Sequence, residues 1–451
     1  MSRHQGRPET LTRRAGLPTP DEPCADCLTE AEAPARRALT VRRPVAFWVV
    51  TYLFAVIMLG TTLPTPLYVI YAAQWHFSSG ITTVIFASYA VGVLAALLLA
   101  GRSSDQAGRR PVLFAALAFS AVSTVVFIVS PAVGWLFVGR VLSGISAGLV
   151  TGTATASLTD IYRGSSSRRA SMVATAANMG GLGLGPLVAG LFAQFGPDPT
   201  VLVFEVYLAL LAVAAVGLAL VPETVGERQK LSLRFTGLGI PRLGRSEFIA
   251  AGVAGFAAFA LLGMFTSLAP SFLGSVLHEH SHAVGGAVVF ALFGTATATQ
   301  LVLARFASRA VMLIGLTVFL AGLALVVAGL SEASLPLFLT GTIVSGVAIG
   351  AVFIGSVSTA VRLAPAEIRG RVASTYFVFA YVGLTIPVIG VGIGSQYAGD
   401  FRAVLVCAIF LAALSAVSMA GIRRADSGLA GMATAGYPGT AQAVRRVVAG
   451  C

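Results

Sequence analysis

Long apolar runs separated by short polar segments dominate the chain from Phe47 onward. Each run has about 20 residues, the length that an α-helix needs to cross a hydrocarbon core of roughly 30 Å. The pattern predicts twelve transmembrane helices over residues 47–70, 80–100, 111–130, 134–157, 170–194, 201–221, 248–273, 284–305, 310–330, 336–361, 372–395 and 402–421. Residues 1–45 lack such runs, and their mixture of Pro, Arg, Glu, Thr and Ala predicts a disordered tail.

The composition agrees with a chain that is solvated by lipid. Hydrophobic residues make up 56% of the 451 residues and charged residues only 11%, whereas soluble domains carry roughly 25% charged residues. The 50 glycines are typical of membrane helices, where small residues let backbones approach closely. The net charge of +12 comes from basic residues placed between the apolar runs, which argues against nucleic-acid binding, because that needs one basic face.

Basic residues alternate between the two sides of the predicted membrane. They follow the second, fourth, sixth, eighth and tenth runs and flank both tails, whereas the odd-numbered junctions contain only Arg402. Lys and Arg are enriched in cytoplasmic loops. We therefore expect a multi-pass protein of the plasma membrane with both termini in the cytoplasm.

An internal repeat predicts two related halves. Residues 139–148 have the pattern GxVxSGxxxG, and residues 341–350 have the similar pattern GxIxSGxxxG. Parallel repeats of this kind are typical of transporters whose substrate site lies between the halves. The predicted organisation is a disordered cytoplasmic tail at 1–45, an N-terminal six-helix half at 46–222, a cytoplasmic linker at 223–247, a C-terminal six-helix half at 248–421 and a cytoplasmic tail at 422–451.

The junction of the second and third runs carries a specific motif. Residues 101–110 spell GRSSDQAGRR, which resembles the GxxxD(R/K)xGRR signature of the major facilitator superfamily, although Gln106 stands where Arg or Lys is usual. The resemblance implies an all-α membrane fold of twelve helices in two pseudo-symmetric six-helix halves. It also implies that this loop controls the switch between inward and outward states, and the candidate residues are Gly101, Asp105, Gly108, Arg109 and Arg110. We expect the glycines to permit a tight turn and Asp105 to cap or face a neighbouring helix N-terminus.

Arg140 stands inside the fourth run, in a segment LxxxRxxSGxxAG over residues 136–148. This segment resembles a family motif whose arginine is tied to proton coupling or substrate binding. An arginine at membrane depth costs roughly 2.5–3.5 kcal/mol on insertion scales, so it is expected to face a wet cavity or an acidic partner. A structural ion pair, or extension of the side chain toward the outer surface, is the alternative.

The resemblance also implies a central cavity formed by helices 1, 4, 5, 7, 8, 10 and 11. The coupling and cavity candidates are Arg140, Gly144, Asn178, Glu205, Tyr68, Gln300 and Tyr376, and further polar groups expected there are Thr61, Thr62, Thr65, Thr266, Thr295 and Tyr381. The acidic candidates are Glu205, near the outer end of its run, and Asp160, just beyond the fourth run. Neither is central, so the sequence leaves the proton carrier unidentified.

The fifth run contains GLGLGPLVAG over residues 181–190. It matches in part a GxxxGPxxGG motif that the family associates with antiporters that export solutes, through Gly181, Gly185, Pro186 and Gly190. A proline bends a helix and frees a carbonyl, and small residues let the helix pack closely. Helix packing alone explains the pattern equally well. The Pro-Glu-Thr exit of the sixth run, at 222–224, also resembles the family.

Two histidine and cysteine patterns suggest metal chemistry and are set aside. Residues 278–282 contain HExxH, but zinc binding through this motif needs a helix and a third ligand, and the segment lies in a short external connector. Sensing of external pH is the milder alternative for His278, His280 and His282. Cys24 and Cys27 have no second pair to complete a site. We expect no metal and no cofactor.

These observations predict a secondary active transporter that works by alternating access and has no enzymatic activity. Few charges lie within the runs, so a neutral or amphiphilic small molecule is the expected substrate, exported by proton antiport. The alternative is an importer, a proton symporter or uniporter, of a small metabolite such as a sugar or organic acid. The expected partners are the substrate, protons and the lipid bilayer, and we expect a monomer.

Overall fold

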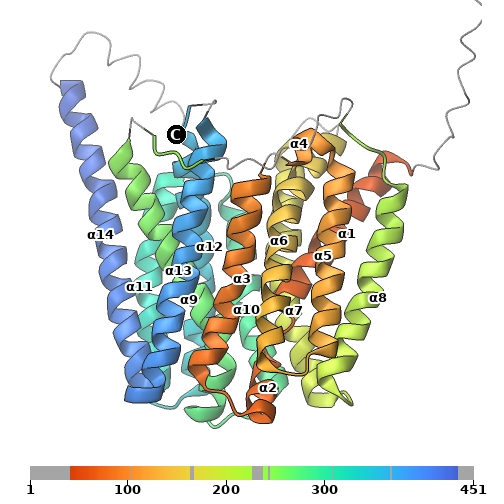
Figure 1. Ribbon diagram of the computed structural model, residues 1–451. Helices are drawn as coiled ribbons and strands as arrows, with labels where there is room; N and C mark the ends of the chain where they lie inside the picture. Colours follow the sequence, from red (N-terminus) through yellow and green to blue (C-terminus); the bar gives the residue numbers. More distant parts are fainter. Residues whose placement is uncertain are drawn as a thin grey trace, which may run out of the picture. The chain divides into compact units, whose positions relative to one another are not determined.

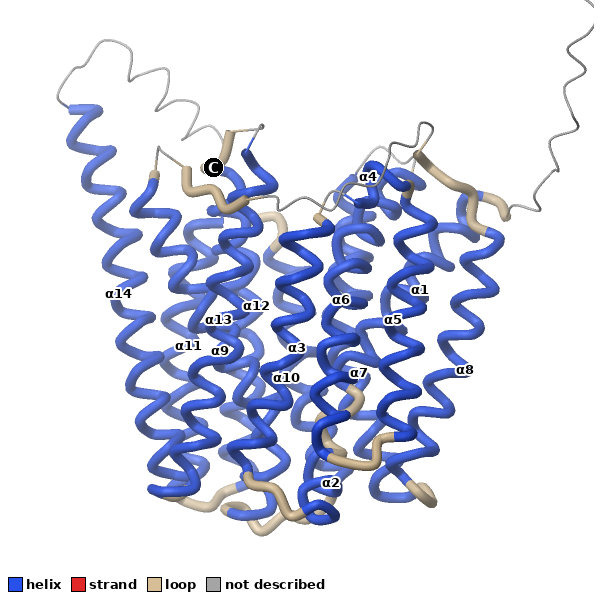
Figure 2. Tube along the Cα trace, viewed as in Figure 1, coloured by secondary structure: helices blue, strands red, loops and turns tan. Residues whose placement is uncertain are grey.

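The computed structural model describes residues 41–101, 103–162, 167–225, 237–241, 244–306, 308–365 and 368–434, without the side chains of 167, 308 and 425–434. In these ranges the chain is helical and contains no strand (Figures 1 and 2). Twelve of the helices are long and apolar enough to cross a membrane, which confirms the twelve predicted spans. The predicted tail at 1–45 lies almost wholly outside the described residues.

Fourteen helices follow one another along the described chain. Their bounds are α1 (Arg43–Thr62), α2 (Tyr68–Trp75), α3 (Ser79–Ala100), α4 (Ser103–Ala107), α5 (Arg109–Val129), α6 (Val133–Ile161), α7 (Ser167–Phe195), α8 (Pro199–Leu220), α9 (Arg245–Ser275), α10 (His282–Leu303), α11 (Ser308–Ser331), α12 (Leu335–Arg362), α13 (Arg369–Ala398) and α14 (Asp400–Thr434). The short helices α2 and α4 are not among the twelve spans.

The prediction of one continuous helix over 47–70 is wrong. The helix α1 ends at Thr62, the chain turns through residues 63–67, and α2 begins at Tyr68. This turn contains Pro64 and Pro66. A proline cannot donate the backbone hydrogen bond of a helix, and it pushes the preceding residue out of the helical region. Hydropathy averaged over a long window does not detect the break, because the turn carries no charged residue and lies between apolar segments.

The helices pack as two sets of six spans. Within the first set, α6 packs on α3 and α5, and α1 packs on α7 and α8; within the second, α12 packs on α10 and α11, and α9 packs on α13 and α14. In Figure 1 the first set lies at the right, with α8 at the edge, and the second set at the left, with α14 at the edge. The sets meet chiefly where α7 packs on α10 and α3 on α13. Residues Thr40–Cys451 form one compact unit.

Hydrogen bonds near one end of the bundle join the two sets. We call this the opposite end, because α4 and the α3–α5 junction lie at the other, arginine-rich end (Figure 1). The Ser79 hydroxyl lies 3.1 Å from both the Gly392 carbonyl oxygen and the Ser395 hydroxyl. The His282 amide donates to the side-chain oxygen of Gln194 at 3.0 Å. The two sets are therefore joined at the opposite end.

The outer surface of the spans is apolar. Trp48 on α1, Val216 on α8 and Val406 on α14 have 62%, 68% and 69% of their surface exposed. Soluble monomers rarely expose contiguous apolar surface on this scale, whereas hydrocarbon tails solvate it without cost. Twelve spans with such a surface make this chain a multi-pass membrane protein.

Candidate functional site

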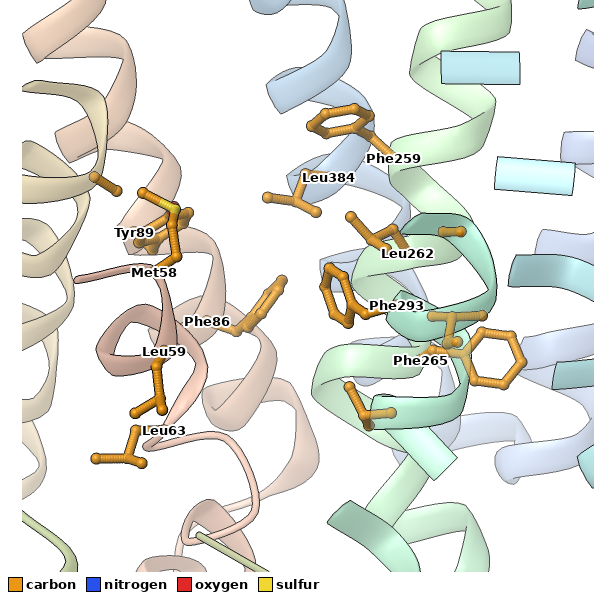
Figure 3. Packing of buried hydrophobic residues seen from close by; sticks show 14 of the residues in the cluster. Met58, Leu59, Leu63, Phe86, Tyr89, Phe259, Leu262, Phe265, Phe293 and Leu384 are labelled. Atoms are coloured by element: carbon orange, nitrogen blue, oxygen red, sulfur yellow. The ribbon is translucent and has the colours of Figure 1, made fainter. Parts of the chain in front are cut away.

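A cavity lies between the two helix sets. It is lined by Thr61 and Thr62 of α1, Phe86 and Tyr89 of α3, Arg140 of α6, Leu182 of α7, Phe259, Leu262 and Thr266 of α9, Phe293 of α10, and Tyr381 and Leu384 of α13. Figure 3 shows Phe86 reaching from α3 toward Phe293 and Leu262 of the second set. The walls are therefore mostly apolar and aromatic, with hydroxyl groups on both sides.

Arg140 is the charged residue in this lining, among the residues that the structure describes. It is only 1% exposed, and its Nη1 donates to the carbonyl oxygen of Thr61. The centre of its guanidinium lies 4.7 Å from the ring centroid of Tyr89 and 5.6 Å from that of Phe86. A cation over aromatic faces is stabilised electrostatically, so these rings hold the guanidinium at the cavity wall.

The positive charge of Arg140 has no described carboxylate beside it. The Nε of Arg140 is buried without a hydrogen-bond partner. The hydroxyl of Tyr68 is also buried without a partner, and Arg140 interacts with it electrostatically. The described ion pairs of the chain involve other arginines. The sequence predicted either a wet cavity or an acidic partner for Arg140, and the structure places it at a cavity.

Several predicted cavity residues do line the cavity. Thr61, Thr62, Thr266 and Tyr381 stand there with Arg140, and Tyr89 interacts with both Thr61 and Tyr381 through its hydroxyl. The sequence analysis missed the apolar and aromatic lining, such as Phe86 and Phe293. These residues have the same spacing and character as core residues of any membrane helix, so no signal in one sequence distinguishes them.

Other candidates lie elsewhere. The Tyr376 hydroxyl is 2.7 Å from that of Ser356 within the second set. Gln300 is buried on α10, and its side-chain nitrogen has no partner. Asn178 is half-buried on α7, while Glu205 is exposed on α8. None of the four is in the cavity lining, so a role in coupling or binding stays a prediction for each.

Gly144 serves a helix crossing. A Cβ there would overlap the backbone oxygen of Tyr89 and lie 3.0 Å from the backbone nitrogen of Val93. The glycine therefore lets α6 approach the backbone of α3, which brings Arg140 of α6 and Tyr89 of α3 to the same wall.

The antiporter-like motif of α7 fits between two neighbours. A Cβ at Gly181 would lie 2.5 Å from the backbone oxygen of Ala55, and one at Gly185 would overlap that of Leu59; both oxygens belong to α1. On the other side, Gly190 packs against the backbone of His282, and the Pro186 carbonyl lies against Gly286. The motif thus lets α7 pack closely on α1 in its own set and on α10 in the other.

A network of charges holds the junction of α3, α4 and α5. Arg109 Nη1 donates to Asp105 at 2.6 Å and to the Ser104 hydroxyl at 2.7 Å. The Arg109 Nε donates to Asp160 at 3.2 Å, and Asp160 lies in the last turn of α6. Asp105 itself is 63% exposed at its side chain.

A different carboxylate caps α5. Glu223, just beyond α8, accepts from the backbone amides of Arg109 at 3.0 Å and of Arg110 at 3.1 Å. Gly108 has a φ of 100°, which favours glycine, and a Cβ there would lie 2.7 Å from the Glu223 carboxylate. The sequence predicted that Asp105 caps or faces a neighbouring helix N-terminus. In the structure Glu223 caps the N-terminus of α5, and Asp105 pairs with Arg109. Gly101, at the end of α3, has a helical φ of −59°, so the turn requires glycine at Gly108 and not at Gly101.

Comparisons with known proteins agree with this architecture. The sequence profile of the Major Facilitator Superfamily matches residues 50–383. Multidrug resistance protein 1 of Bacillus subtilis is 27% identical over 179 residues, which cover 40% of this chain and 46% of that protein. The class D tetracycline resistance protein of Salmonella ordonez is 36% identical over 115 residues, or 25% of this chain and 29% of that protein. The chain thus matches less than half the length of either relative.

Solved structures share the fold. The crystal structure of a bacterial homologue of the human lysosomal transporter Spinster superposes with a TM-score of 0.66 and 14% sequence identity, over 84% of this chain and 97% of that one. At this identity the likeness concerns the fold alone.

Proposed function

Because the chain belongs to the major facilitator superfamily, whose members are transporters, we propose that it exports a neutral or amphiphilic small molecule by alternating access. The observation that carries the proposal is the cavity between the two helix sets, with its apolar walls and a single described charge. Such a cavity favours a largely apolar solute, because multiply charged groups would lose their hydration there without compensation. The partial matches to two resistance proteins support export.

In this proposal the halves 46–222 and 248–421 rock about the cavity. The arginine-rich end faces the cytoplasm of a plasma-membrane protein, in line with the positive-inside rule. The charge network of Arg109, Asp105 and Asp160 at that end changes partners as the halves move. The antiporter-like segment of α7, packed between α1 and α10, is the pivot between the sets.

An ion gradient is the proposed source of energy. The sequence has no GxxxxGK(S/T) loop for ATP phosphates, and we propose proton antiport by a monomer with no cofactor and no catalytic activity. Arginine does not deprotonate in proteins, so Arg140 is not the proton carrier. The alternative, import of a small metabolite such as a sugar or organic acid, predicts the opposite direction of solute movement.

Accumulation of fluorescent amphiphiles in expressing cells tests direction and coupling. Three dodecyl compounds that carry the same nitrobenzoxadiazole dye and end in a carboxylate, a methyl ester or a quaternary ammonium serve as probes. We expect expression to lower accumulation of at least one probe at least twofold, and a protonophore to abolish that effect. Increased uptake would support import, and unchanged accumulation of all three would overturn export of amphiphiles.

The variant Asp105→Asn tests the switch loop in the same assay. The substitution removes the charge that pairs with Arg109 at 2.6 Å, so we expect it to reduce export at least fivefold. The matched control is Asp198→Asn, because Asp198 is exposed and has a φ of 42° that asparagine also tolerates. Equal export by both variants would remove the switch loop from the mechanism.

A further inference from the structure

We propose that the transported molecule carries one negative charge, which pairs with Arg140 at the wall of the central cavity. This rests on the proposed function, and it narrows the substrate class from neutral or amphiphilic molecules to monoanionic amphiphiles such as carboxylates or sulfonates with an apolar body. The described cavity lining contains this cation but no carboxylate to balance it. In this proposal the ligand supplies the negative charge.

The argument begins with the cost of a buried cation. Burial of an ion is expensive unless it is paired and hydrogen-bonded, and Arg140 is 1% exposed. The described partners of its guanidinium are the Thr61 carbonyl and the rings of Phe86 and Tyr89. All are neutral, so they compensate the charge only in part.

The described acidic residues are engaged or placed elsewhere. Asp105 and Asp160 pair with Arg109, and Glu223 caps α5. Glu247, the buried acid of α9, has one oxygen 3.9 Å from both Arg309 and Arg362. Glu205 is exposed on α8. The cavity therefore has a net positive charge among the described residues.

The geometry around Arg140 suits one anionic group with an apolar body. The Nε of Arg140 is a buried donor without a partner, and an unmade hydrogen bond of this kind is costly. Charge-assisted bonds to a carboxylate are about twice as strong as neutral ones. Beyond the guanidinium the lining consists of apolar side chains such as Phe86, Phe259 and Phe293 and of neutral hydroxyl groups, so a second charge on the ligand would find no charged partner.

Binding of the same three probes to the purified full-length protein in detergent tests the inference. The dye fluorescence is titrated at pH 7.4, where the carboxylate probe is ionised. We expect the carboxylate to bind at least tenfold more tightly than the ester and the ammonium compound. Arg140→Gln should abolish this preference, and Arg140→Lys should retain part of it, since lysine keeps the charge but not the planar donor fork. Arg402→Gln, an exposed arginine of α14, is the matched control and should keep the full preference.

Two results would overturn the inference. One is equal or absent binding of the carboxylate relative to the other probes in the unmodified protein, a comparison that does not depend on folding of any variant. The other is an unchanged preference in an Arg140→Gln protein that elutes as a single monodisperse peak. Transport of the probes by proteoliposomes separates the two proposals. If the protein transports the probes without charge preference, the monoanionic substrate class is refuted and the proposal of export stands. If it binds the carboxylate selectively but transports no probe, the anion site stands and export of amphiphiles is refuted.

Discussion

A single carboxylate stabilises the turn that leads into α5. Glu223 accepts from the amides of Arg109 and Arg110, groups that would otherwise lack partners in the first turn of a helix, and its charge opposes the positive end of the helix dipole. Glu223→Gln keeps the shape but removes the charge, so we expect a loss of about 1–2 kcal/mol in the free energy of unfolding. Thermal unfolding in detergent measures it as a lower midpoint.

The control for this residue is Glu205→Gln. Glu205 is exposed on α8, and its substitution should leave the midpoint unchanged. If the two variants unfold at the same temperature, the charge of Glu223 does not stabilise the α5 junction.

At the scale of single residues, the sequence identified the junction of α3 and α5 but not the residues that contact it. The spacing of residues 101–110 marked the turn, and the Pro-Glu-Thr segment at 222–224 was recognised without a role. The contact between them joins residues 114 positions apart, and no local pattern encodes such a distance. The same holds for Arg140, whose burial was predictable from its place in an apolar run, while its neutral partners were not.

At the scale of the helices, the crossing of α3 and α6 depends on glycine. Gly144 faces the Tyr89 and Val93 backbone of α3, whereas a Cβ at Gly152, two turns further along α6, would meet no atom within 4 Å. We expect Gly144→Ala to cost about 1–3 kcal/mol through overpacking, seen as a lower unfolding midpoint and less folded protein. Gly152→Ala is the matched control and should be neutral or slightly stabilising, because alanine favours helix.

An equal effect of the two alanines would show that helix propensity, not the α3–α6 contact, determines stability here.

The elements themselves were largely predictable, since runs of about 20 apolar residues are dictated by bilayer thickness. Their ends were not: α6 continues to Ile161 and α14 to Thr434, because a helix extends past the hydrocarbon wherever its backbone bonds remain satisfied, and hydropathy does not report that extension.

At the scale of the whole molecule, the repeat in the sequence predicted two sets of helices but not how they meet. The groups that join them near the opposite end are the hydroxyls of Ser79 and Ser395 and the Gln194 side chain, which accepts from the His282 backbone amide. All lie near helix ends, and nothing in their local sequence marks them. The cavity lining combines residues from seven helices, so it follows from the packing of the sets and not from any one motif.

The contact at the opposite end gives a direct test of alternating access. The hydroxyl oxygens of Ser79 and Ser395 lie 3.1 Å apart, so the sulfur atoms of cysteines at these positions are within reach of a disulfide. In a chain with the native cysteines replaced, Ser79→Cys with Ser395→Cys should form a cross-link that holds α3 to α13. If this end must open during each cycle, the oxidised protein should lose at least nine-tenths of its probe transport and recover it on reduction. Ser79→Cys alone should transport in both redox states, and full activity of the cross-linked protein would exclude rocking of the two halves about the cavity.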